Sequence, residues 1–207
     1  YRSLTGRRDS LHANYLMSKG TKAWDFGYSF PIGHHGTKLD VGYSANTNEI
    51  KKGELASLGV KGKAHSINAT LRVPFYVNQH ARYETGLQFV RQNSRTDLGT
   101  KLDERVRWVD DKITRFTPYI SFIHYGDNQL FYHRYSVDFS RRDDVSNTRN
   151  SAAIYKFDSF YQRRFDHGQT FNFRFDGQIT TKKLLGSSDR YYIGGVNSVR
   201  GYEESFM

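Results

Sequence analysis

Two pairs of adjacent aspartates are the first groups in this sequence that could do chemistry, Asp110 with Asp111 and Asp143 with Asp144. Paired carboxylates can share acid–base work when burial or a like charge raises the pKa of one of them. Both pairs lie among Lys and Arg in segments that we expect to be charged loops, where nothing raises a pKa. The sequence shows no nucleophile placed with a base. We therefore expect that the protein is not an enzyme.

The histidines, cysteines and glycines do not predict a metal or cofactor site. The eight histidines show no metal-ligand spacing, and His34 and His35 lie in a short turn without a His-Glu-x-x-His context. Cysteine is absent, which excludes a thiolate zinc site and a disulfide framework. The run Gly-Gly-Val-Asn-Ser-Val-Arg-Gly is not followed by Lys-Ser or Lys-Thr, so it is not a phosphate-binding loop. We expect no metal and no cofactor.

The charge balance is strongly basic, with 31 Lys and Arg against 21 Asp and Glu in 207 residues. Such an excess can indicate nucleic-acid binding. Here the cations are spread over every predicted strand and loop, and Arg141, Arg142, Lys182 and Lys183 fall in predicted loops. We interpret them as a solvated surface that can touch lipid phosphates, and we expect no nucleic-acid partner.

The elements that position these residues are predicted from a period of two. Phe171, Phe173 and Phe175 fall on one face of a strand, while Arg174 and Asp176 fall on the other. Similar alternation occurs in residues 38–45, 66–73, 82–89 and 131–139, and more weakly in 11–17, 24–30 and 155–161. Residues 116–125 are apolar on both faces. This pattern predicts about nine strands of an all-β fold, without a helix.

Two architectures produce this alternation, a soluble sandwich and a transmembrane β-barrel whose polar face lines a lumen. The predicted strand length of about ten residues favours the barrel. Aromatic residues near strand ends favour it too, since they would form an interfacial girdle: Trp24, Phe30, Phe75, Tyr76, Tyr125 and Phe165. The polar faces carry charges of both signs, which suits a wet lumen. The residues predicted to line it are Arg72, Arg82, Glu84, Arg134, Asp138, Arg174 and Asp176.

The predicted connections alternate between short and long. Short ones are expected at 33–37, 75–80, 126–129 and 166–169, and long polar ones at 47–63, 92–114, 141–151 and from 181 onward; only 19–22 breaks the rule. Outer-membrane barrels have short periplasmic turns and longer extracellular loops, so this order also predicts the orientation of the chain. About nine strands do not close a barrel, and we expect further strands beyond Met207.

The last predicted loop carries a motif that resembles a known superfamily. Its residues are Gly194, Gly195, Asn197, Ser198, Val199, Arg200, Gly201 and Tyr202. The sequence Gly-Gly-Val-Asn-Ser-Val-Arg-Gly-Tyr resembles the conserved loop of the outer-membrane insertase and translocase superfamily, and it is most similar to the loop of the two-partner secretion (TpsB-type) branch. Residues 28–33, Tyr-Ser-Phe-Pro-Ile-Gly, are similar to a turn common in that branch.

The resemblance implies a fold and a function. It implies that residues 1–207 are part of a barrel of 16 strands, monomeric and located in the bacterial outer membrane among lipid and lipopolysaccharide. The motif loop would fold back into the lumen, where Arg200 pairs with an acidic residue beyond Met207. POTRA domains would precede Tyr1. The complete protein would translocate a large TpsA-type exoprotein to the cell surface.

Three other functions remain open from the sequence. A BamA- or TamA-type insertase has the same fold but handles other barrels as clients. In a passive porin-like channel the loop motif would be incidental. A soluble β-sandwich binding module would also show the period-two pattern.

Overall fold

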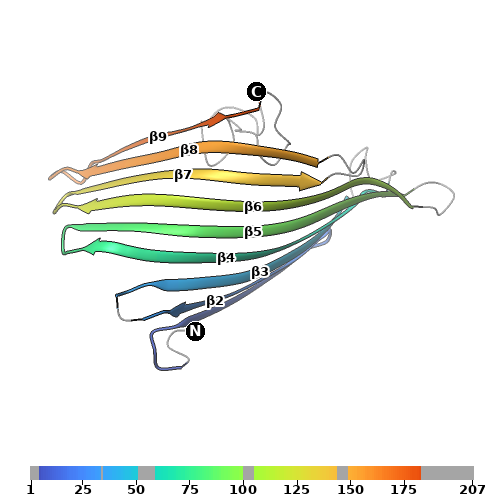
Figure 1. The fold of residues 1–207 in the computed structure, drawn as a ribbon, viewed down its shortest axis with the longest axis horizontal. Coiled ribbons are helices and arrows are strands. Elements are labelled where there is room, and N and C mark those ends of the chain that lie inside the picture. Colours follow the sequence, from blue (N-terminus) through green and yellow to red (C-terminus); the bar gives the residue numbers. More distant parts are fainter. Residues whose placement is uncertain (1–4, 34, 51–58, 100–104, 144–148, 183–207) are drawn as a thin grey trace.

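The computed structural model describes residues 5–33, 35–50, 59–99, 105–143 and 149–182, and these form one antiparallel sheet. Nine strands lie side by side in chain order, each paired with the next (Figure 1). Within the described residues, no helix is long and apolar enough to cross a membrane. The strands are β1 (Ser10–Met17), β2 (Thr21–Pro31), β3 (Lys38–Glu49), β4 (Lys61–Val77), β5 (Ala81–Gly99), β6 (Arg105–Tyr125), β7 (Gln129–Asp143), β8 (Arg149–Arg164) and β9 (Thr170–Thr180). The predicted all-β fold of about nine strands is confirmed.

The central strands are longer than the ten residues that the pattern predicts. β5 has 19 residues and β6 has 21, so most of the loop predicted at 92–114 is a continuation of these two strands. The loop predicted at 141–151 shrinks in the same way between β7 and β8. These two predictions were wrong because polar segments still pair their backbones: opposite charges such as Arg95 and Asp110 face each other across β5 and β6, which stabilises the ladder.

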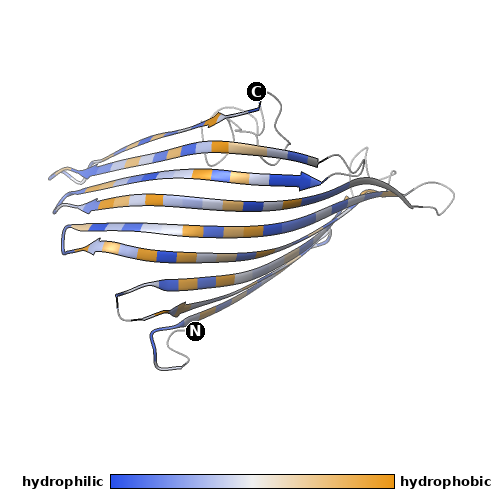
Figure 2. Ribbon diagram, viewed as in Figure 1, coloured by the Kyte–Doolittle hydropathy of each residue, from blue (hydrophilic) through white to orange (hydrophobic). Residues whose placement is uncertain are grey.

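The strand register pairs apolar residues with apolar residues and polar residues with polar residues across the sheet. One continuous row of paired residues reads Val41, Ala69, Phe89, Phe116 and Phe139 from β3 to β7. The neighbouring row on the other face includes Asp40, Thr70, Gln88 and Thr117. The sheet therefore has one apolar and one polar face, and the bands of hydropathy alternate along its strands (Figure 2).

The burial of the two faces is the reverse of that in a soluble sheet. On the apolar face Phe175 is 57% exposed and Ile179 is 68% exposed, whereas on the polar face Ser121 is 3% exposed and Asp138 is 4% exposed. A water-soluble sheet buries its apolar face, because exposing that much apolar surface to water is unfavourable. The apolar face is therefore suited to lipid.

Aromatic rings form a continuous belt across the apolar face at one end of the sheet. Tyr83 of β5 contacts both Tyr76 of β4 and His124 of β6, with ring centroids 5.0 and 5.2 Å apart. The belt continues from His124 through Phe131 and Tyr161 to Phe171 of β9. Such a girdle is typical of the boundary between hydrocarbon and lipid headgroups.

The aromatic belt lies at the end of the sheet where the connections are tight. β4 and β5 are joined through residues 78–80, and β6 and β7 through residues 126–128. In the turn between β2 and β3, Gly33 and Gly36 have φ of 72° and 78°, a backbone conformation that favours glycine. We call this end the short-turn end and the opposite one, where β5 and β6 project farthest, the strand-extension end (Figure 1).

Candidate functional site

The polar face of the sheet is the candidate functional site, because it gathers the charged residues that the sequence singles out. The structure places all seven predicted lumen-lining residues on this one face, distributed over β4, β5, β7 and β9. They are Arg72, Arg82, Glu84, Arg134, Asp138, Arg174 and Asp176. That this face borders a lumen stays a prediction.

Asp138 of β7 is the centre of the most buried charged cluster. Its Oδ1 accepts a hydrogen bond from the Thr117 hydroxyl at 2.7 Å, and its Oδ2 lies 2.7 Å from the Lys156 Nζ. The Nε of Arg115 lies 3.8 Å from the same Oδ2. Two cations from the flanking strands thus hold one carboxylate that is 4% exposed. Charges in such a position are tolerated only when they are paired.

Further ion pairs cover the rest of the polar face. Arg72 reaches Asp40 of the neighbouring strand at 2.6 Å, and Arg82 contacts Glu84 on its own strand at 3.1 Å. Towards the strand-extension end, Arg142 forms a two-pronged pair with the buried Asp111. At the β9 edge, Arg174 pairs with Asp176 at 2.9 Å in a more exposed setting.

The alternation predicted for residues 38–45 already places Asp40 on the polar face, and the structure confirms it. Arg115 and Lys156 were missed by the sequence reasoning, because Lys156 lies in a segment with weaker alternation and Arg115 directly precedes the segment that is apolar on both faces. Asp111 and Arg142 were assigned to charged loops, where no partner is expected. Their pairing follows from the extension of β6 and β7, which the composition does not reveal.

Tyr119, the aromatic ring at the middle of the polar face, packs between a glycine and an arginine. Tyr119 is 7% exposed, and the Arg134 guanidinium lies 4.1 Å from its ring centroid, within range of a cation–π interaction. The ring covers Gly86, its register partner on β5, so closely that a Cβ there would lie 2.5 Å from Cε1 of Tyr119. Glycine is thus needed at position 86 for space, which orients Tyr119 and through it Arg134.

We expect Gly86→Ala to lower the free energy of unfolding by about 1–3 kcal/mol, because the methyl group must push the Tyr119 ring away from the sheet. The measurement is urea unfolding of the protein inserted in lipid vesicles. Gly62→Ala on β4 is the matched control, since a Cβ there would meet no atom closer than 3.9 Å. Equal destabilisation by both substitutions would contradict the packing role of Gly86.

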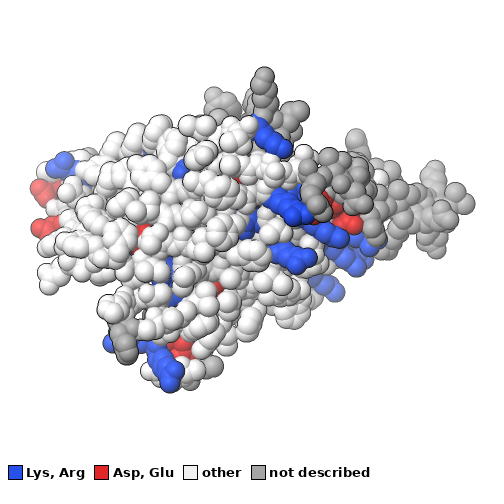
Figure 3. Space-filling model, in the orientation of Figure 1, with Lys and Arg blue, Asp and Glu red and all other residues white. Residues whose placement is uncertain are grey.

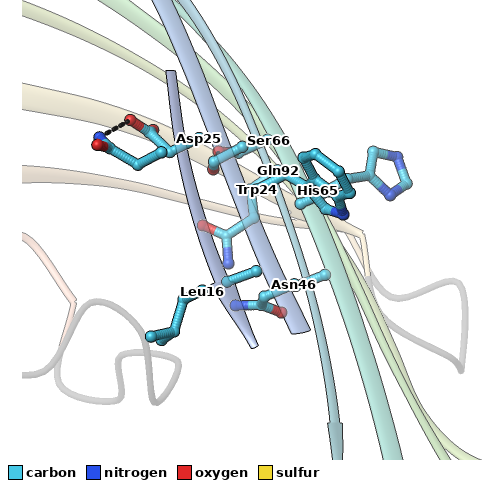
Figure 4. Close-up of a pocket in the computed structure, with 12 residues that line it drawn as sticks. Leu16, Trp24, Asp25, Asn46, His65, Ser66 and Gln92 are labelled. Carbon is cyan, nitrogen blue, oxygen red and sulfur yellow. Dashed lines mark hydrogen bonds between the residues drawn. The ribbon is translucent and has the colours of Figure 1, made fainter. Parts of the chain in front are cut away.

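A hollow of about 360 Å³ opens near β1–β4 at the strand-extension end, and its lining is mostly uncharged (Figure 4). Asn46, Ser66 and Gln92 contribute amide and hydroxyl groups, and Asp25 accepts a hydrogen bond from the Asn14 amide. Across the residues that the structure describes, no group of three His, Cys, Asp or Glu could hold a metal ion. This lining offers hydrogen-bond donors and acceptors without a strong charge preference.

Asp9, just before β1, is buried and accepts four hydrogen bonds. It accepts them from the backbone N–H and the hydroxyl of Thr5 and from the hydroxyl of Tyr28, at 2.9–3.3 Å. Burial raises the pKa of Asp9, but these hydrogen bonds outweigh it and hold the pKa below its ordinary value. Asp9 thereby ties residues 5–9 to β2 at the short-turn end.

The motif loop of the sequence, from Gly194 through Arg200 to Tyr202, lies outside the described residues. Its insertion into a lumen and the role of Arg200 stay predictions. An antiparallel sheet with an exposed apolar face and a buried, ion-paired polar face has the wall architecture of a transmembrane β-barrel.

Comparison with known proteins shows which family of β-barrel proteins the chain belongs to. The chain belongs to the haemolysin secretion/activation protein ShlB/FhaC/HecB family, whose family model matches residues 3–207. The structure is similar to that of CdiB from Acinetobacter baumannii, with a TM-score of 0.72 and 19% sequence identity. The similarity covers 97% of this chain and 38% of the CdiB chain. No curated protein matches the sequence. The resemblance to the two-partner secretion branch is confirmed.

Proposed function

We propose that this chain forms part of the wall of a two-partner secretion transporter in the bacterial outer membrane. The observation that carries the proposal is the reversed burial of the sheet, polar face inside and apolar face outside, in a chain of the ShlB/FhaC/HecB family. The described chain corresponds to 38% of the CdiB chain, so the activity of the complete protein is inferred. Its substrate would be a large TpsA-type exoprotein, translocated from the periplasm to the cell surface.

The polar face would act as the inner wall of the transport route. Its cations are held by carboxylates, as in the Asp138 cluster and the Arg72–Asp40 pair, so an unfolded client meets a surface whose charges are already compensated. Hydroxyl and amide groups between the pairs can exchange hydrogen bonds with an extended backbone. This role requires neither catalysis nor a cofactor.

The proposed orientation puts the short-turn end in the periplasm and the strand-extension end at the cell surface. The tight turns at the first end support this assignment, because outer-membrane barrels have short periplasmic turns and longer extracellular loops. The apolar face would contact membrane lipid and lipopolysaccharide. The full barrel would have 16 strands and act as a monomer, with POTRA domains on the periplasmic side.

The experiment that tests this function is depletion of the gene that encodes the protein, followed by quantitative proteomics of the culture supernatant and the outer membrane. We expect the loss of one large secreted protein while other outer-membrane barrels stay unchanged. A general fall in barrel proteins would instead support an insertase of the BamA or TamA type. No change in either compartment would contradict transport and favour a passive channel.

A further inference from the structure

A cluster of cations lies on the apolar face at the strand-extension end, directly beside the apolar band. Arg91, Thr114 and Arg141 are register partners on β5, β6 and β7, and Lys112 follows two residues from Thr114 on the same face. All three cations are exposed. Figure 3 shows Lys and Arg side chains gathered at this end of the molecule, next to a broad surface that is almost free of charge.

The cluster has more positive charge than its own contacts neutralise. Within the described part of the chain, neither Arg91 nor Lys112 has an ion pair. Arg141 has one carboxylate nearby, that of Asp143, at 3.9 Å, and Asp143 also faces Lys112 across the strand pair. Three cations therefore surround the Thr114 position, with the carboxylates of Asp143 and Asp110 at their border. Surface cations usually project into solvent, but Arg91, Thr114 and Arg141 directly adjoin the apolar row of Phe89, Phe116 and Phe139 on the same face.

The neighbouring surface fits an acyl chain. The adjacent row on the same face is Phe89, Phe116 and Phe139. Beyond it lies a groove of about 390 Å³ lined mainly by apolar groups of β6–β9, including Ile120 and Val137. Val137 is four residues from Arg141, which corresponds to about 13 Å along β7 at roughly 3.3 Å per residue. A lipid with a phosphate at the cluster could place part of an acyl chain in this groove.

We propose that Arg91, Lys112 and Arg141 form a binding site for the phosphate groups of lipopolysaccharide, with an acyl chain of the same molecule in the groove. This inference rests on the proposed function, because it requires the strand-extension end to face the outer leaflet. The phosphates supply negative charge beside hydrocarbon, which matches cations placed beside an apolar band. Thr114 offers a hydroxyl donor at the centre of the site.

The test compares wild-type full-length protein with the double variant Arg91→Gln/Lys112→Gln, purified from outer membranes in mild detergent. Affinity for added lipopolysaccharide is measured by titration with a fluorescently labelled preparation. Each interfacial cation contributes about a five-fold change in affinity, so we expect the double variant to bind roughly twenty-five-fold more weakly. An unchanged affinity would overturn the proposal.

The matched control removes two cations at the opposite end, Arg163→Gln/Arg164→Gln, on β8 at the short-turn end. This control variant should bind lipopolysaccharide with the affinity of the wild type. An equal loss of affinity in both double variants would show that net charge alone matters, and it would overturn the proposed binding site. The conservative variant Arg91→Lys/Lys112→Arg should retain most of the affinity if phosphate binding is responsible. Membrane fractionation separates this result from the proposed function: protein found outside the outer membrane would contradict the transporter itself.

Discussion

Replacing Asp138 by alanine is expected to lower the free energy of unfolding of the inserted protein by about 3–5 kcal/mol. The substitution removes the carboxylate that pairs with Lys156 and Arg115, so both cations lose this counter-charge on a buried part of the polar face. It also leaves the Thr117 hydroxyl without its acceptor. The measurement is equilibrium unfolding by urea in lipid vesicles, followed by tryptophan fluorescence.

The control for this prediction is Asp25→Ala on the same face. Asp25 lies 3.2 Å from His12, but its side chain is 48% exposed and the pair is screened by solvent. We expect its removal to change the free energy of unfolding by no more than about 1 kcal/mol. If Asp138→Ala were as mild as Asp25→Ala, the Asp138 cluster would be well hydrated and its burial would not contribute to stability.

The faces of the sheet could be predicted from the sequence because side chains alternate along a strand whatever the strand packs against. Phe173 and Phe175 were placed opposite Arg174 and Asp176, and the structure has them so. Residues 116–125 could not be assigned to faces in this way, because both faces carry apolar residues there. In the structure Ile123 and Tyr125 lie on the polar face, and Ile120 and Phe122 lie on the apolar face. Only pairing with the neighbouring strands resolves its orientation.

The ends of the strands could not be predicted in the same way. A strand that leaves the hydrocarbon no longer needs apolar residues, so its composition is that of a charged loop. Asp111 and Arg142 illustrate the consequence: each was assigned to a loop, yet they are 31 residues apart in sequence and joined by two hydrogen bonds across β6 and β7. Backbone pairing decides this contact, and it leaves no local signal.

Partners across strands are fixed by register, which the alternation does not specify beyond the choice of face. Asp138 could be placed on the polar face from sequence, but its contacts with Thr117 and Lys156 depend on how β7 aligns with both of its neighbours. The same holds for Gly86, whose lack of a side chain matters only because β6 brings Tyr119 over it. The motif alone points to the family, whereas the partners in the buried clusters follow only from the strand register.

Leu87→Arg is expected to weaken insertion into lipid vesicles by about 2–4 kcal/mol, the cost of an arginine near the middle of the bilayer. In a soluble sheet, a surface substitution of this kind would change stability by about 0.5 kcal/mol at most. The large effect follows from the environment: Leu87 pairs with Leu71 and Pro118 on the apolar face, midway along β5 between the aromatic belt at Tyr83 and the cation Arg91, so the arginine would be placed against hydrocarbon. Folding into vesicles during a urea titration measures the difference.

Gln88→Arg is the matched control, because Gln88 is the next residue on β5 and lies on the polar face between Thr70 and Thr117. The same new charge there would face the polar side, and we expect a change of no more than about 1 kcal/mol. An equal cost at both positions would mean that lipid does not cover the apolar face. Tolerance of Leu87→Arg would contradict the membrane assignment outright, since a charge in the middle of a lipid-facing strand has no partner to compensate it.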